Sequence, residues 1–249
     1  MAERRLCAVI PAAGRGARLG FDIPKIMVEI ADGVAVWHLL HRRLRPYVEH
    51  VHVVMSPEGE GPFRALAAEE IAGGQVSVSV QERPTGMGGA IFGAATHWEP
   101  YDAILVVWGD QANLSLSTVR RVTGTHEKGL TLPLVPMPDP YVEYETDGGA
   151  LVRVRQSREG DECRPGGLSD VGVFCLATDG LREEWTRYLA GAAVGARTGE
   201  VNFLPFLPHL SRQGWPLSVV PVTDPDEARG INTAEDLEFA RRAYLRCDR

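Results

Sequence analysis

The chain has 249 residues, 24% of them charged, and a formal net charge of −7 at pH 7. This length suits one large α/β domain or two small ones, and the acidic balance, with no basic stripe to answer it, argues against a nucleic-acid binder. The four cysteines lack CxxC spacing and neighbouring histidines, so they are expected to be reduced thiols. No apolar run resembles a signal peptide or a membrane span, and we expect a cytoplasmic protein without a membrane partner.

The first predicted element is a strand followed by a loop suited to phosphate. Residues 6–10 form a continuous apolar run, as in a parallel strand buried on both faces. Gly14 and Gly16 then remove side-chain bulk, so the backbone can turn and direct its N–H groups at an anion. A polyphosphate is the ligand that this loop favours. The positive charges of the loop are Arg15, Arg18 and Lys25.

Two other interpretations of this loop are open. Gly14-x-Gly16 after a strand is also typical of a dinucleotide fingerprint, but Leu19 stands where the third glycine belongs. Pro24 would also break the helix that a dinucleotide fold requires. A plain surface loop is the remaining alternative, since glycine and arginine are common in loops.

Further along, the hydrophobic pattern predicts helices over 36–44 and 63–71 and strands over 51–55 and 76–80. The last of these strands ends at Gln81, whose planar amide can pair with a nucleobase edge. Gly86, Gly88 and Gly89 follow in a turn, and a helix is expected from about Ala90. A strand, glycine turn and helix in this order offer free N–H groups and a helix dipole to a ligand. A routine βα connection is the alternative.

The most apolar strand is predicted over 103–108, and it ends abruptly in Gly109-Asp110. Ligands of open α/β sheets bind at the carboxyl ends of the strands. Since Mg²⁺ prefers carboxylate and phosphate oxygens, Asp110 is the leading candidate for a metal ligand. The alternative is a helix N-cap, a role that Ser115 or Ser117 already fills.

Residues 136–175 break the alternation of strands and helices and are the expected site of a second substrate. The stretch with Tyr141 and Tyr144 is interpreted as an active-site loop, and strands are predicted over 130–135, 151–155 and 173–176. A helix over 181–189 and a strand over 217–222 follow. At the end of the chain, Thr233 and Asp236 resemble a capping box, with Asn232 at the entrance of the last helix.

These motifs occur in the order seen in sugar-phosphate nucleotidyltransferases. The segments are PAAGRGARLGFDIPK, QERPTGMGGA, WGD, GGALVRV, SDVG and GINTAEDL. Jointly they most resemble the uridylyltransferase half of bifunctional N-acetylglucosamine-1-phosphate uridylyltransferases, over nearly the whole chain. The resemblance implies a single nucleotidyltransferase domain over 1–249, with a nucleotide-binding half (1–135) and a sugar-phosphate-binding, closing half (136–249). It implies an α/β fold: a Rossmann-like, doubly wound mixed sheet of the GT-A type, with a small inserted substrate-binding β region.

The same resemblance assigns roles to individual residues. Arg18 and Lys25 would act in catalysis on the phosphates. Asp110 and Asn232 would hold Mg²⁺. The implied nucleotide contacts are Ala13, Gly14, Gly16, Gln81, Gly86 and Met87. The implied sugar-phosphate contacts are Gly149, Glu159, Asp170 and Glu200.

Three departures from the family pattern bear on the substrates. Ala17 and Met87 stand where the family has threonine. Asp170 replaces an asparagine. Because a carboxylate cannot donate a hydrogen bond and repels phosphate, the identity of the sugar phosphate is left open. Arg155 and Arg158 are expected near Asp170 and would neutralise it. The short segment RQSREGDE replaces a longer hairpin, so Glu159 or Glu162 is expected to take over its contacts.

The predicted reaction is nucleotidyl transfer from a nucleoside triphosphate, with UTP favoured, to a sugar 1-phosphate, with a hexosamine favoured. A phosphate monoester is already a nucleophile at neutral pH, and no Ser-His-Asp or Cys-His arrangement is seen, so alignment and charge neutralisation would carry catalysis. Since the sequence ends at Arg249, no acetyltransferase extension is expected. The alternatives are a cytidylyltransferase acting on an alcohol phosphate or phosphonate, a GT-A-type glycosyltransferase, and a non-catalytic nucleotide sensor.

Overall fold

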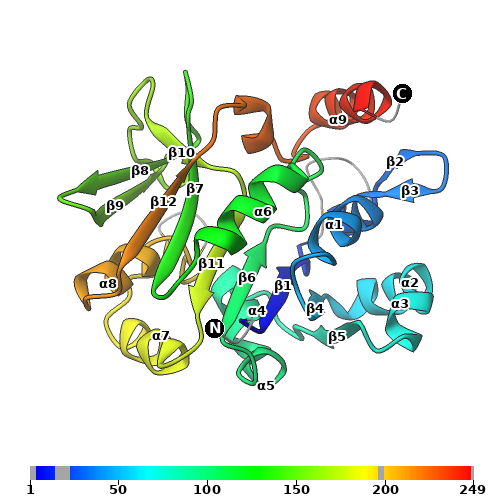
Figure 1. Ribbon diagram of the computed structural model, residues 1–249, viewed down its shortest axis with the longest axis horizontal. Coiled ribbons are helices and arrows are strands. Elements are labelled where there is room, and N and C mark those ends of the chain that lie inside the picture. The colour runs from blue at the N-terminus through cyan, green and yellow to red at the C-terminus, as the bar shows by residue number, and fades with distance from the viewer. Residues whose placement is uncertain (1–3, 15–22, 196–198, 248–249) are drawn as a thin grey trace.

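A computed structural model describes residues 4–14, 23–195 and 199–247, and in this part of the chain a ten-stranded mixed sheet carries helices on both faces (Figure 1). The parallel strands are β1 (Leu6–Pro11), β4 (His50–Met55), β5 (Val76–Val80) and β6 (Ala103–Val107). They lie in the order β5-β4-β1-β6. The apolar runs of β1 and β6 are continuous because helices cover both sides, whereas histidines interrupt β4 and serines interrupt β5. The predicted doubly wound α/β fold is confirmed.

Beyond β6 the sheet becomes antiparallel. The order continues with β11 (Val173–Ala177), β7 (Leu130–Pro136), β10 (Leu168–Asp170), β8 (Val142–Asp147) and β9 (Ala150–Gln156). A further strand, β12 (Leu217–Pro221), pairs in parallel with β7. Strands β8, β9 and β10 form the inserted β region that the sequence predicted. Tyr144 belongs to β8 and is 2% exposed, so its assignment to an active-site loop is wrong.

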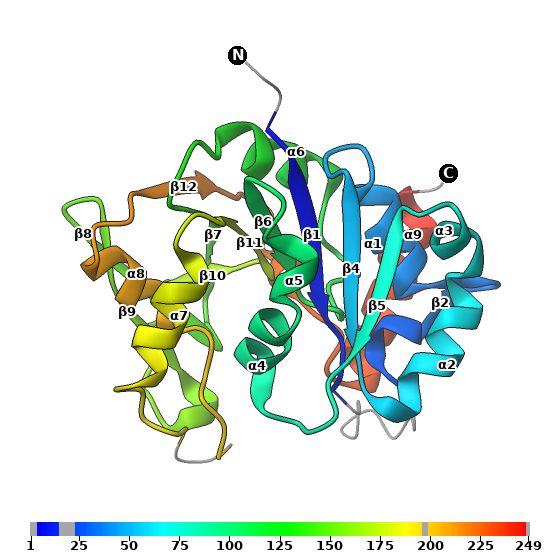
Figure 2. The same cartoon turned by 90° about the horizontal axis from the view of Figure 1, so that it is seen from below.

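Two helical layers enclose the sheet (Figure 2). One face is covered by α1 (Val36–Leu44), α2 (Pro57–Leu66), α3 (Ala68–Ala72), α6 (Leu116–Thr125) and α9 (Ala234–Cys247). The other face is covered by α4 (Gly86–Gly93), α5 (Ala95–Trp98), α7 (Leu181–Leu189) and α8 (Phe206–Arg212). The division of the chain at residue 135 stays a prediction, although Leu237 and Ala240 of α9 pack into the core formed with α1.

Two helices begin earlier than the sequence predicted. Helix α2 starts at Pro57, after Ser56, whose hydroxyl accepts the N–H of Gly59. Proline suits this first helical position because its missing N–H would have had no partner there. Helix α4 starts at Gly86 instead of near Ala90. The glycine turn is therefore the first turn of the helix itself.

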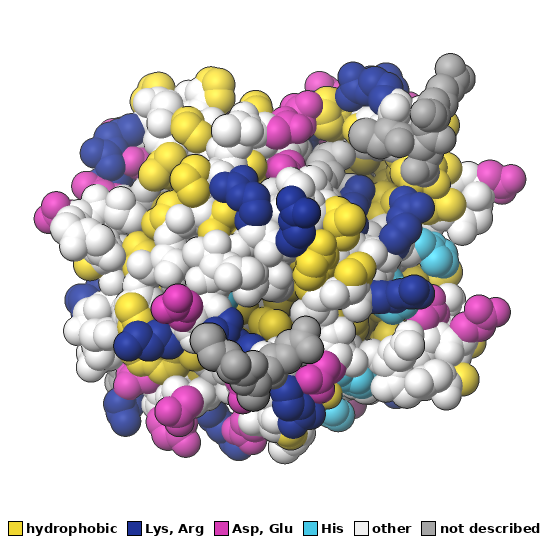
Figure 3. All heavy atoms as spheres, in the orientation of Figure 1, with side chains coloured by type: hydrophobic (Ala, Val, Ile, Leu, Met, Phe, Trp, Pro, Cys, Tyr) yellow, Lys and Arg dark blue, Asp and Glu magenta, His cyan; other side chains and the backbone are white. Residues whose placement is uncertain are grey.

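The surface has no membrane-spanning feature among the described residues, since none of their helices is both long enough and apolar enough to cross a bilayer. In the space-filling view, basic, acidic and hydrophobic side chains are interspersed on the side of the molecule that carries α6 (Figure 3). A short antiparallel ribbon of β2 (Glu29–Ala31) and β3 (Val34–Ala35) lies outside the main sheet, next to α9.

Candidate active site

The carboxyl ends of β1 and β6 bring the first two predicted motifs together. These strands are parallel neighbours, so the loop after Pro11 and the Gly109-Asp110 pair emerge at the same edge of the sheet. A β-carbon on Gly109 would lie 3.2 Å from the β-carbon of Ala12. The glycine thus permits the close approach of the segment before Asp110 to the start of the loop after β1.

Three predicted site residues from distant parts of the chain meet at one ammonium group. Lys25 follows Pro24 in a short 3₁₀ helix, Lys25–Met27, and its Nζ donates to Asp110 Oδ2 at 2.8 Å and to Asn232 Oδ1 at 2.7 Å. The side chains of Lys25 and Asp110 are 22% and 21% exposed, so this ion pair is partly shielded from solvent. Shielding strengthens the attraction relative to a surface pair.

Asn232 is fixed by bonds on both of its sides. The N–H of Ile231 donates to the carbonyl of Asp110 at 3.0 Å. The N–H of Asn232 donates to Asp236 Oδ2 at 3.0 Å, and Thr233 and Asp236 exchange the two hydrogen bonds of a capping box, as predicted. The carboxylate of Asp236 also pairs with Arg229 at 2.7 Å, and these bonds hold the pKa of Asp236 below its ordinary value against the effect of burial.

The donor set around Lys25 fits a hard divalent cation. Asp110 Oδ2 and Asn232 Oδ1 already converge on one positive charge, and both are oxygens, the atoms that Mg²⁺ prefers. Gly230 lies against the same carboxylate, where a β-carbon would come within 3.1 Å of Asp110 Oδ1. Within the described residues, no cluster of three or more His, Cys, Asp or Glu forms a metal site. Because Mg²⁺ usually keeps water and substrate phosphates in its shell, two protein oxygens would be enough to hold it.

A pocket of about 420 Å³ opens beside this group. Six of the predicted site residues line it: Gly14, Lys25, Met87, Asp110, Asp170 and Asn232. Tyr141 and Arg158, expected in an active-site loop and near Asp170, also line it. The sequence interpretation missed four other lining side chains: Trp108, Gln111, Gln156 and Ser169. Gln156 had a detectable signal, because the alternation along its strand puts it on the same buried face as Val154.

Several predicted contacts lie elsewhere. Gln81 stands at the end of β5, and its Nε2 donates to Thr85 Oγ1 at 3.0 Å and to the carbonyl of Gly86 at 3.1 Å. Gly86 adjoins Glu200, since a β-carbon on the glycine would lie 2.9 Å from the Glu200 carboxylate. The predicted base contact Gly86 and the predicted sugar contact Glu200 are thus neighbours, outside the lining of the 420 Å³ pocket.

Two sugar-side predictions are not brought to the pocket. Gly149 occupies the turn between β8 and β9 with a positive φ of 82°, a conformation that favours glycine. Glu159 follows the end of β9, and neither residue is among those that line the pocket. Ala13 directly precedes the lining residue Gly14. Gly16 and Arg18 lie outside the described residues.

The surroundings of Asp170 differ from the expectation. Arg155 does not face it; the guanidinium pairs with Glu143 at 3.3 Å and with Glu145 at 2.7 Å. The reason is strand alternation, which turns Arg155 to the face opposite its pocket-lining neighbour Gln156. Arg158 does line the pocket, and its Nη2 donates to Asn202 Oδ1 at 2.6 Å.

Asp170 itself is 9% exposed and accepts the N–H of Gly172 at 2.7 Å. Burial raises the pKa of Asp170 above its ordinary value, and the hydrogen bond from Gly172 opposes this rise. A β-carbon on Gly172 would overlap the side chain of Gln111, and the φ of Gly172 is +73°. The glycine therefore allows Gln111 and Asp170 to form adjacent parts of the pocket wall.

Comparison with known proteins gives one family and a wider set of related folds. Residues 8–139 match the family model described as the MobA-like NTP transferase domain. One similar crystal structure is that of a protein from Bacillus anthracis, provisionally named a glucose-1-phosphate thymidylyltransferase, in complex with sucrose. The TM-score is 0.73 with 13% sequence identity, and the alignment covers 96% of this chain and 94% of that one. At this identity the likeness concerns the fold.

Proposed function

This chain belongs to the MobA-like NTP transferase family, and we propose that it transfers a nucleotidyl group from a nucleoside triphosphate to a sugar 1-phosphate. The observation that carries the proposal is the meeting of Lys25, Asp110 and Asn232 beside the first glycine loop and at the mouth of a pocket. Positive charge and oxygen ligands at the carboxyl ends of parallel strands suit a polyphosphate and its metal.

In the proposed reaction, a phosphate oxygen of the acceptor attacks the α-phosphorus of the triphosphate. The new P–O bond forms as the bond to the β-phosphate bridging oxygen breaks, and pyrophosphate leaves. No general base is needed, because the attacking phosphate monoester is already ionised. Lys25 would neutralise charge that develops on the phosphates, and Gly14 would let the backbone approach them. Mg²⁺ held by Asp110 and Asn232 would add charge neutralisation and alignment.

The finer substrate assignments are part of the same proposal. UTP is the favoured donor and a hexosamine 1-phosphate the favoured acceptor, because the motifs most resemble the uridylyltransferase half of N-acetylglucosamine-1-phosphate uridylyltransferases. Gln81, Gly86 and Met87 would contact the base, with Met87 at the edge of the pocket. The Bacillus anthracis relative, whose provisional name refers to glucose 1-phosphate and thymidylyl transfer, agrees with this reaction class. Arg18 remains a proposed phosphate ligand.

The test replaces Lys25 or Asp110 by alanine and measures pyrophosphate release. Either change should lower kcat by about 10² to 10³, the usual cost of removing one preorganised charge-stabilising group. Lys128→Ala is the matched control, because Lys128 is an exposed lysine in the turn between α6 and β7. Circular dichroism should show that all three variants fold. Unchanged turnover in the folded Lys25 or Asp110 variant would refute the assignment.

A substrate screen separates this proposal from its alternatives. UTP, CTP, dTTP, GTP and ATP would each be paired with sugar 1-phosphates and with alcohol phosphates or phosphonates. Pyrophosphate release with CTP and an alcohol phosphate alone would favour the cytidylyltransferase. Hydrolysis of a nucleotide sugar without pyrophosphate formation would favour a GT-A-type glycosyltransferase. Tight nucleotide binding without turnover would favour a sensor.

A further inference from the structure

Asp170 is a buried carboxylate in the wall of the substrate pocket. It ends β10, is 9% exposed and lines the same 420 Å³ space as Lys25 and Asp110. Its Oδ1 accepts the N–H of Gly172 at 2.7 Å, and the buried Tyr144 hydroxyl is its neighbour. These are neutral donors, so they orient the carboxylate without neutralising its charge.

No basic side chain of the described residues forms an ion pair with Asp170. Lys25 is directed at Asp110, and Arg155 at Glu143 and Glu145. Arg158, although it lines the pocket, contacts Asn202 and Glu159. A buried carboxylate without a cation is unfavourable, and removing such a deficit is a large source of binding energy for a ligand that supplies the charge.

The rest of this pocket wall also suits a cation that still carries hydrogen-bond donors. Trp108 and Tyr141 belong to this wall, and aromatic rings attract ammonium groups. Gln111 is 4% exposed, lies against Gly172 beside Asp170, and its Oε1 has no hydrogen-bond partner. Gln156, 4% exposed, offers a second amide to the same space. Among the described residues, this wall thus combines a carboxylate, two amides and two aromatic residues with one basic side chain, Arg158.

We propose that the acceptor substrate carries a protonated amine, and that its ammonium group pairs with Asp170 while its phosphate lies toward Lys25 and Asp110. This inference rests on the proposed function, which requires a phosphate at the Lys25 end of the pocket. It adds that the wall formed by Asp170 selects a positive charge in place of a neutral hydroxyl or acetamido group. Amino sugar 1-phosphates and aminoalkyl phosphates share this chemistry.

Matched acceptors test the proposal and separate these two sources. Glucosamine 1-phosphate would be compared with N-acetylglucosamine 1-phosphate and glucose 1-phosphate, and phosphoethanolamine with ethyl phosphate, each with the best donor nucleotide. In each series the amine-bearing acceptor should have the higher kcat/KM, by about 100-fold, the scale expected when a buried charge gains or loses its partner. The series in which the amine-bearing acceptor is preferred shows whether the substrate is an amino sugar 1-phosphate or an aminoalkyl phosphate; a preference in both series means that the site accepts both. Equal kcat/KM within both series would overturn the inference.

Asp170→Asn tests the residue directly. Asparagine is of equal size, and its Oδ1 can keep the hydrogen bond from Gly172, so the pocket wall should survive. The ratio of kcat/KM for the amine-bearing over the neutral acceptor should fall from about 100 toward 1. Asp139→Asn is the matched control, since Asp139 is an exposed carboxylate on the loop before Tyr141. A ratio that stays unchanged in the folded Asp170 variant would contradict the proposed pair.

Calorimetric binding of the same acceptors distinguishes a failed inference from a failed function. Preferential binding of glucosamine 1-phosphate or phosphoethanolamine, lost in Asp170→Asn, would support the ammonium site even if no pyrophosphate were released, and only the proposed reaction would then fall. Turnover with equal binding of amine and neutral acceptors would overturn the ammonium site alone. If neither the amine-bearing nor the neutral acceptors bound in the presence of the nucleotide, the ammonium site would also be overturned.

Discussion

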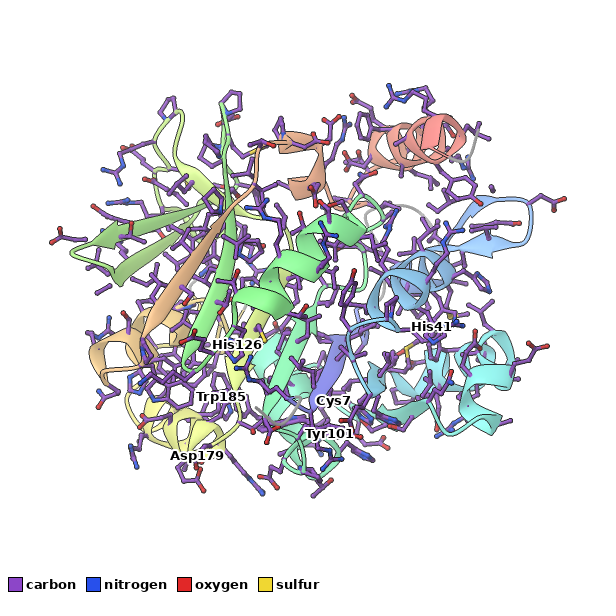
Figure 4. All side chains as sticks on the ribbon, in the orientation of Figure 1. Cys7, His41, Tyr101, His126, Asp179 and Trp185 are labelled. Atoms are coloured by element: carbon purple, nitrogen blue, oxygen red, sulfur yellow. The ribbon has the colours of Figure 1, made fainter. Side chains whose placement is uncertain are left out.

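Because two histidines are buried, we predict that the protein loses stability in mild acid. His52 on β4 is fully buried, and its ring nitrogens bond the hydroxyls of Ser77 and Ser79 at 2.7 and 2.8 Å. Burial, the largest cause, and the neighbouring His97 lower the pKa of His52 from 6.5 to about 3. His126, which caps the end of α6, is 1% exposed, and burial lowers its pKa to about 4 (Figure 4).

The sign of the effect follows from proton binding. As the pH falls through 6.5, both histidines become protonated in the unfolded chain but stay neutral in the folded protein. The unfolded state then binds more protons, so the free energy of unfolding decreases as the pH falls toward the folded pKa values. Each histidine contributes about 1.4 kcal/mol per pH unit. Because the unfolded histidine is already half protonated at pH 6.5, the loss between pH 6.5 and 5 is about 1.6 kcal/mol for each residue and about 3 kcal/mol for both.

This pH window isolates the histidines from the carboxylates with lowered pKa values. Glu143 and Asp236 contribute stability that is lost only as the pH falls below their ordinary values of 4.5 and 3.8 toward their lower folded values. Urea unfolding at pH 7.5, 6.5, 5.5 and 5.0 would measure the free energy. His52→Gln and His126→Gln should each reduce the loss of unfolding free energy between pH 6.5 and 5 by about 1.6 kcal/mol. Curves parallel to that of the wild type would refute the reasoning.

Two further substitutions test packing and the metal site. Gly88→Ala should destabilise the protein by about 1–3 kcal/mol, because the new β-carbon on α4 would overlap the ring of Trp185 on α7, which Figure 4 labels. Gly61→Ala in α2 is the control, because nothing lies within 4 Å of the β-carbon that it adds. An equal urea midpoint for both variants would contradict this account. Asn232→Ala should raise the Mg²⁺ concentration for half-maximal pyrophosphate release at least about tenfold, and an unchanged requirement would remove Asn232 from the proposed metal ligands.

The meeting of Lys25 and Asp110 could be anticipated because the signals on which it depends are local in sequence. Strand β5 and helix α1 have the predicted bounds, and β1, β4 and β6 differ from the prediction by one residue. A strand buried on both faces is a continuous apolar run, so its end is visible, and ligands gather at such ends. Asp110 stands just beyond the end of β6 and Lys25 follows the loop after β1, and the structure joins them at 2.8 Å. The roles of these residues in catalysis stay predictions.

The start of α2 shows where local preference is a poor guide. Its first six residues, PEGEGP, contain two prolines and two glycines, which lower intrinsic helix propensity. Pro57 fits because it stands at the first helical position, and Gly59 because its small size admits Pro24, whose Cγ would be 2.8 Å from a β-carbon there. Tertiary contact with the loop before Lys25 therefore overrides the composition.

The acceptor side depends on strand register, which the sequence does not state. Strand β9 pairs with β8 so that Gln156 lies opposite Val142, and both line the pocket, while Arg155 lies opposite Glu143 on the other face. A shift of one residue would exchange these faces and send Arg155 into the pocket. Glu143, 1% exposed and paired with Arg155, stabilises the observed register. That register keeps Arg155 away from Asp170, and in the proposed complex the ammonium group of the substrate supplies the positive charge instead.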